Sequence, residues 1–200
     1  MHRQAQITFI NRYLQQGALQ APVFQTGRFE NLITDITRTG TQGAMETFPA
    51  IAINAEDYQP IIPDDTYPIQ LYHRINNVSY ATDRNAVGDN NQKVIERLHM
   101  KLVVWVKLTA IKLTVEQLEA RLAEGFPDVF PASTLSSINL QSMLVTLTGS
   151  NLNSEAVFRE EYKGFAPFAT PYHTLFSMHY TIESKYRKGC FNTCDPLCNG

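Results

Sequence analysis

The chain has 200 residues, enough for one ordinary domain or for one domain with extended arms. Only 18% of the residues are charged, and 13 Asn, 12 Gln and 18 Thr make the chain neutral-polar. The net charge of -2 argues against a protein that binds nucleic acid by neutralising phosphates. No apolar stretch is long enough for a membrane span, and the first residues lack the apolar core of a signal peptide. We therefore expect no membrane partner and no sequence-specific DNA binding.

The N-terminal half predicts one helix followed by extended chain. Gln4 to Gln16 places apolar side chains at helical spacing, and Gly17 ends the pattern. Thr26 to Gly43 fits a short helix or an extended hairpin arm, because its apolar spacing is helical while its threonines disfavour a helix. Beyond it we expect strands at Phe48–Asn54, with Ile51 and Ile53 on one face, and at Tyr67–Tyr80, and then a polar loop at about 81–92.

The C-terminal half contains the clearest patterns. From Arg97 to Leu108 every second residue is apolar, which predicts a strand. Its other face includes Val103 and Trp105, so we expect that face to meet another element as well. The next helix should have Thr114 and Gln117 as a capping box, Leu118 and Leu122 as its buried stripe, and Gly125 at its end. We then expect a strand at Ser137–Thr148, a short helix capped by Asn153 or Ser154, and a last strand at Thr174–Tyr186.

These elements predict an α+β fold: a mostly antiparallel sheet with an N-terminal helix, a central capped helix packed on the sheet, and extended arms. Residues 1–188 are expected to form a single domain, with an arm at about 26–47 and a loop at about 81–92. Residues 189–200 form a separate cysteine-containing tail.

The sequence contains no recognisable catalytic constellation, so we expect no enzyme and no cofactor. His173 and His179 could share a strand face, but they would lie roughly 20 Å apart, too far for one metal ion; the histidines are interpreted as exposed or loop residues. The segment from Asp83 partly matches a calcium loop but has valine at two ligand positions. Asp57, Asp64 and Asp65 are interpreted as solvated loop charges.

All three cysteines, Cys190, Cys194 and Cys198, lie in the last eleven residues. Such a distribution does not predict a disulfide-stabilised fold, and it favours a reducing compartment. On a helix their spacing would bring three thiolates to one face, where they could bind a soft metal. However, Pro196 interrupts such a helix and no fourth ligand is evident. We therefore expect no metal, and a reduced tail that is mobile or is ordered by a neighbouring subunit.

Four segments carry a resemblance to a known family: Phe48–Ile53, Val103–Val106, Leu113–Glu119 and Ser154–Tyr162. With the order of elements, the chain resembles the neck or tail-completion proteins of tailed bacteriophages, in particular the tail-terminator-like fold. Its composition is similar to that of connector ring proteins of crAss-like Bacteroides phages. The resemblance implies a structural virion protein, present in the host cytoplasm before assembly. It also implies a ring of identical subunits between portal and tail that lines or seals the DNA channel, and it assigns no catalytic or ligand residue.

The expected partners are other copies of the chain and the neighbouring portal, connector or tail proteins, with DNA only passing through. Segments too polar to be buried by themselves are the expected intersubunit contacts. Their scattered apolar side chains are the candidate contact residues: Phe29, Ile33, Ile36, Phe191 and Leu197. The alternative is a monomeric binding module with a metal-binding cysteine tail. The oligomeric state and metal analysis distinguish the two.

Overall fold

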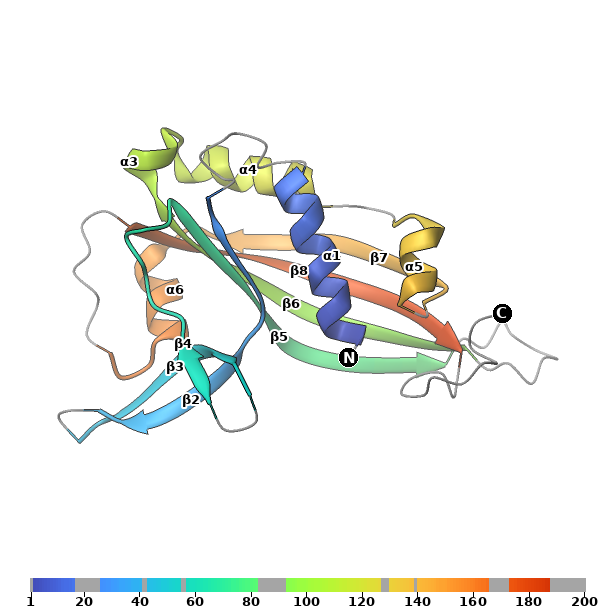
Figure 1. The fold of residues 1–200 in the computed structure, drawn as a ribbon, viewed down its shortest axis with the longest axis horizontal. Helices are drawn as coiled ribbons and strands as arrows, with labels where there is room; N and C mark the ends of the chain where they lie inside the picture. Colours follow the sequence, from blue (N-terminus) through green and yellow to red (C-terminus); the bar gives the residue numbers. More distant parts are fainter. Residues whose placement is uncertain are drawn as a thin grey trace.

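The protein is described from a computed structural model, which describes residues 2–16, 26–40, 43–54, 57–82, 93–126, 130–138, 140–165 and 173–187 (Figure 1). The fold is α+β with a mostly antiparallel arrangement of strands, as the sequence predicts. Within these ranges, no helix combines the length and apolar character needed to cross a membrane. The helices are α1 (His2–Gln16), α3 (Leu108–Ile111), α4 (Val115–Gly125), α5 (Ala132–Ser137) and α6 (Ser154–Glu161). The strands are β1 (Arg28–Leu32), β2 (Thr34–Thr39), β3 (Met45–Ala52), β4 (Tyr58–Pro60), β5 (Ile69–Thr82), β6 (Lys93–Lys107), β7 (Ser142–Asn151) and β8 (His173–Arg187).

The strands form two sheets. The main sheet has the order β1-β5-β6-β8-β7, in which β1 runs parallel to β5 and the other neighbours are antiparallel. The small sheet has the order β2-β3-β4 and is antiparallel throughout. In Figure 1, α1 crosses the long strands of the main sheet, and the small sheet lies beside α6 at one end of the molecule.

Strand β6 carries a hydrophobic core on each of its faces. On one face Leu98, Met100, Leu102, Val104 and Val106 join the main core, which also contains buried residues of α1, α4 and α5. On the other face Val103 and Trp105 join a second core, formed with α6 and the small sheet. The prediction that the second face of this strand meets another element is therefore confirmed.

The predicted helices at the two clearest positions are confirmed by their contacts. In α1, Ile7, Ile10 and Leu14 are fully buried. At the start of α4, Thr114 Oγ1 accepts a hydrogen bond from Gln117 N at 3.2 Å, and Thr114 N donates to Gln117 Oε1 at 3.0 Å. Leu118 and Leu122 are fully buried, so the capped helix is packed on the sheet. Asn153, not Ser154, caps α6 by accepting from Ala156 N at 3.1 Å.

The segment from Thr26 to Gly43 is extended and not helical where the structure describes it. β1 pairs with β5, and β2 pairs with β3 as a hairpin. Pairing with distant strands decides this conformation, and it agrees with the low helix propensity of the threonines. The first part of the predicted arm at about 26–47, β1, therefore belongs to the main sheet, and the rest forms the β2–β3 hairpin.

Several predicted strand boundaries are wrong. Residues Ala132–Ser137 form α5, which follows Pro131, and β7 begins only at Ser142. The apolar spacing after Ser137 fits a strand. However, Leu140 N donates a hydrogen bond to Leu135 O, so the chain there is still bonded to the end of α5. Strand β3 begins at Met45 and ends before Ile53, and Leu108 belongs to α3 and not to β6.

Candidate functional site

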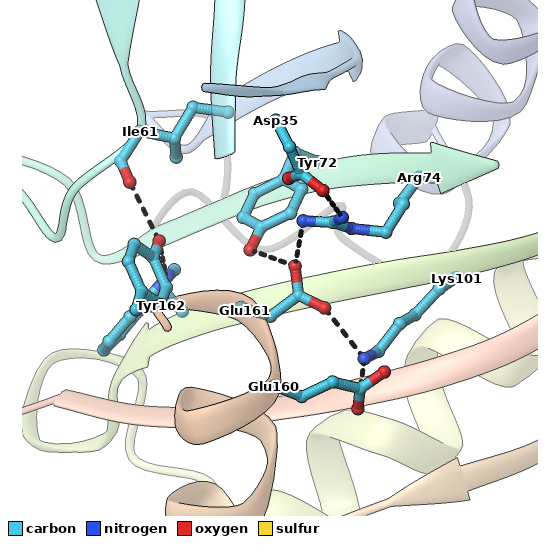
Figure 2. A network of polar contacts seen from close by, with 9 residues as sticks. Asp35, Ile61, Tyr72, Arg74, Lys101, Glu160, Glu161 and Tyr162 are labelled. Carbon is cyan, nitrogen blue, oxygen red and sulfur yellow. Dashed lines mark hydrogen bonds and ion pairs between the residues drawn. The ribbon is translucent and has the colours of Figure 1, made fainter. Parts of the chain in front are cut away.

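A network of charged side chains lies between α6, the main sheet and the small sheet (Figure 2). At its centre is Glu161, the last residue of α6, whose side chain is 1% exposed. Its Oε1 accepts from Lys101 Nζ at 2.8 Å, and its Oε2 accepts from Arg74 Nη2 at 2.8 Å and from Tyr72 OH at 3.1 Å. Both carboxylate oxygens are thus engaged by donors from β5 and β6, which compensates for the cost of burying the charge.

The network reaches solvent at two ends. Lys101 Nζ also lies 2.6 Å from Glu160 Oε2, and the side chain of Glu160 is 57% exposed. Arg74 Nη1 donates to Asp35 Oδ2 of β2 at 2.5 Å, and the side chain of Asp35 is 43% exposed. The chain of contacts therefore connects the β2–β3 hairpin to α6 through the interior of the protein.

Burial and neighbouring charges keep Tyr72 protonated and Arg74 charged in this network. Burial, followed by Tyr162 and Glu161, raises the pKa of Tyr72 well above its ordinary value. For Arg74, burial lowers the pKa, but the hydrogen bond to Asp35 and the charge of Glu161 outweigh it and raise the pKa overall. Tyr72 stays a neutral donor and Arg74 stays a cation. Because Lys101, Arg74 and Tyr72 all lie on the main sheet, their contacts with Glu161 fix the end of α6 to that sheet.

Aromatic side chains extend the same contact region. Tyr162 accepts from Trp105 Nε1 at 3.0 Å and donates from its hydroxyl to Ile61 O at 2.8 Å. Phe158 stacks on Tyr162 with a centroid distance of 5.1 Å. The end of α6 is therefore bonded both to β6 and to the chain that follows β4.

The hairpin is fixed to α6 by a close backbone approach. Thr47 N of β3 donates to Lys163 O at 2.8 Å. Gly164 has φ of +83°, and a Cβ at this position would lie 2.3 Å from Met45 O. A glycine is needed here both for the backbone conformation and for space. The guanidinium of Arg38 also lies over the ring of Phe165, 6.0 Å from its centroid, and together these contacts make the hairpin a docked element.

A second buried polar cluster joins α1, β5 and β8. Asn11 Nδ2 donates to Glu30 O at 3.1 Å, so its Oδ1 is an acceptor for His73 Nε2 at 2.7 Å. His73 Nδ1 then accepts from Tyr180 OH at 2.6 Å. Burial lowers the pKa of His73 to about 3, which agrees with this neutral tautomer. The interpretation of the histidines as exposed or loop residues is wrong for His73, which is fully buried.

The candidate intersubunit residues that the structure describes pack within their own chain. Phe29 is partly buried against the main core, and Ile33 and Ile36 are partly buried against the second core. Their apolar character therefore requires no neighbouring subunit. Phe191 and Leu197 lie outside the described residues, as do Cys190, Cys194 and Cys198 and the loop residues 83–92.

The candidate ligand residues do not converge in the described part of the chain. His173 lies opposite Lys107 and His179 opposite Lys101, at separate positions along β8. Asp65 is exposed, and its Oδ1 lies 3.6 Å from His173 Nδ1. Over the described ranges, no group of three or more His, Cys, Asp or Glu residues is placed to hold a metal ion.

Sequence reasoning missed the residues at the centre of the network, namely Arg74, Lys101 and Glu161. The one available signal is that Lys101 lies in the middle of a strand whose second face was predicted to be covered. Its partner Glu161 is 60 residues away in the chain, so no local spacing could identify the pair.

The large exposed apolar side chains are unevenly distributed. Four of them belong to the small sheet or directly follow its strands: Met45, Ile53, Tyr58 and Ile62. Tyr80 of β5, Leu144 of β7 and Leu152 just beyond β7 are also exposed.

No protein-family model matches the chain, and no curated protein sequence matches it significantly.

Proposed function

We propose that the chain is a structural virion protein that forms a closed ring of identical subunits in the neck of a tailed bacteriophage. The ring joins the portal side to the tail and surrounds the DNA channel. Its partners are other copies of the chain and the adjacent portal, connector or tail proteins. In this role the protein needs no catalytic residue and no cofactor.

The observation that carries the proposal is the docked small sheet with its exposed apolar side chains. Met45 lies at the turn end of the β2–β3 hairpin, and Ile53 and Tyr58 lie at the opposite end of β3. Exposed apolar side chains at both ends of one projecting element offer a surface that a partner can cover. Figure 1 shows the hairpin extending away from the main sheet, where a neighbouring subunit can reach it.

Two further features support the proposal. The first is the α+β order of an N-terminal helix, a hairpin and a mostly antiparallel sheet with packed helices, which is the pattern on which the resemblance rests. The net charge of -2 suits a channel through which DNA passes without being held by phosphate contacts.

The experiment is to measure the size of the full-length chain, alone and mixed with the portal and connector proteins of the same genome. We expect light scattering and electron microscopy to show closed rings with a central channel, or such rings attached to the portal. A chain that stays monomeric both alone and with these proteins contradicts the proposal. Metal analysis of the same sample tests the expected absence of a bound metal.

A further inference from the structure

Of the four edge strands that the structure describes, β7 is the longest, and it contains no charged residue and no proline. Among the described strands, β1 and β7 flank the main sheet, and β2 and β4 flank the small sheet. Exposed strand edges pair readily with other chains, and natural proteins protect them with charged residues, with proline or by keeping the strand short. The four edge strands differ in how far they follow this rule.

Two of the edges are protected. β1 has five residues, including Arg28 and Glu30, and its Glu30 O accepts a hydrogen bond from α1. β4 has three residues and ends in Pro60. β2 contains two charged residues, Asp35 and Arg38, but both are paired within the chain. In contrast, β7 has ten residues, Ser142–Asn151, and none of them is charged or proline. Such an edge is typical of a strand that pairs with another chain.

We propose that the outer edge of β7 pairs with the outer edge of β2 in a second copy of this chain. The main sheet of one subunit then continues into the small sheet of the next. This inference rests on the proposed ring and names the surfaces that would form it. Main-chain hydrogen bonds supply the affinity, and Leu144, 48% exposed, gains cover from the added strand.

Length and charge favour β2 as the occupant. With six residues it is longer than β1 and β4, and its exposed Thr34, Thr37 and Thr39 are β-branched. Its two charges are neutralised within the chain, since Asp35 is paired with Arg74 and Arg38 with Glu46. The uncharged edge of β7 therefore meets an edge whose charges are already balanced.

The positions of the two edges fit a head-to-tail contact. β7 and β2 lie on opposite sides of the molecule in Figure 1, so one subunit can use both edges at the same time. When two different surfaces of identical subunits pair, each subunit is related to the next by the same rotation. The subunits form a ring if successive rotations return to the first subunit. Pairing of β7 with β7 of another copy would instead stop at a dimer.

The test uses two blocked variants of the full-length chain. Leu144→Lys with Thr146→Lys blocks β7, and Thr34→Lys with Thr39→Lys blocks β2, because lysines on an edge oppose pairing. The matched control, His99→Lys with Ala120→Lys, adds two lysines at exposed positions on the central strand β6 and on α4. Circular dichroism and thermal unfolding confirm that each variant is folded before its size is measured.

We expect the wild type and the control to assemble, and each blocked variant to be a monomer. An equimolar mixture of the two blocked variants should form a one-to-one dimer and nothing larger, because it retains one intact β7 edge and one intact β2 edge. A blocked variant that assembles like the wild type overturns the inference. So does a dimer of the β2-blocked variant alone, which would show β7–β7 pairing, or a wild type that is monomeric at every concentration.

The outcomes separate this inference from the proposed function. If rings persist in both blocked variants, the edge pairing is wrong and the neck ring stands. If the variants behave as expected but the wild type forms open filaments that do not bind the portal protein, the edge pairing stands and the neck proposal fails.

Discussion

Lys101 and Glu161 form a 2.8 Å ion pair whose two side chains are 0% and 1% exposed. The pair connects the central strand β6 to the end of α6, across 60 residues of sequence. Removing both charges from water is costly, and the cost is offset here by Arg74, Tyr72 and Glu160. Since the pair and its partners come from β5, β6 and α6, they fix the position of α6 and, through Arg74 and Asp35, that of the hairpin.

Removing one member of this pair should therefore be costly. We expect Lys101→Met to lower the free energy of unfolding by about 3–5 kcal/mol, because Glu161 loses one of its two cationic partners while it stays buried. Lys101→Met combined with Glu161→Gln should cost less than the sum of the single changes. Urea unfolding measures all three values. Arg97→Ala is the matched control on β6: its ion pair with Glu183 is largely exposed, and its loss should cost about 1 kcal/mol or less. Equal costs for Lys101→Met and Arg97→Ala would contradict the structural role of the buried pair.

Gly164 should tolerate no side chain. Gly164→Ala places a Cβ against Met45 O and keeps a positive φ, so we expect it to destabilise the protein and to loosen the hairpin. Gly43→Ala is the control, since Gly43 has φ of +77° but no atom within 4 Å of the added Cβ. The control should cost about 1 kcal/mol through backbone strain alone, and Gly164→Ala clearly more. Thermal unfolding together with protease sensitivity near Met45 measures the difference. Similar values for the two variants would show that the close approach to β3 is not needed.

The stability of the protein should depend on pH through His73. The pKa of His73 is about 3 in the folded state and has an ordinary value of 6.5 in the unfolded chain. Between these values the unfolded state binds a proton that the folded state excludes, so stability is lost as the pH falls. The contribution is about 1.4 kcal/mol for each pH unit. His73→Gln should lower stability near neutral pH but remove this part of the slope between pH 6.5 and about 3. Chemical unfolding at several pH values measures both slopes, and identical slopes would rule out His73 as the source.

In α4, the loss of the N-terminal cap and the loss of a core contact should have different costs in the free energy of unfolding. Thr114→Ala should cost about 1 kcal/mol through the lost hydrogen bond to Gln117 N. Leu118→Ala should cost about 2–5 kcal/mol, because Leu118 is fully buried in the main core. If calorimetry gave the same few tenths for both, the helix could not be packed on the sheet as described.

The sequence predicted those parts of the fold that local patterns determine. The strand β6 was predictable because apolar residues alternate along it. The helix α4 was predictable because its cap and its buried leucines are close together in the sequence. The segment from Thr26 remained open between helix and strand, because Phe29, Ile33 and Ile36 have helical spacing while the threonines disfavour a helix. Pairing with β5 and β3 decides in favour of strands. The buried contacts were not predictable. Arg74 lies 87 residues and Lys101 60 residues from Glu161, and His73 owes its burial to Asn11 and Tyr180 on other elements.

The central claim is that copies of this chain close into a ring in the virion neck. Electron microscopy of the full-length protein, alone and with the portal protein of the same genome, tests it most directly. We expect closed rings with a central channel. All rings should have the same number of subunits, and they should attach to the portal at one end. A protein that remains monomeric in both samples would contradict it.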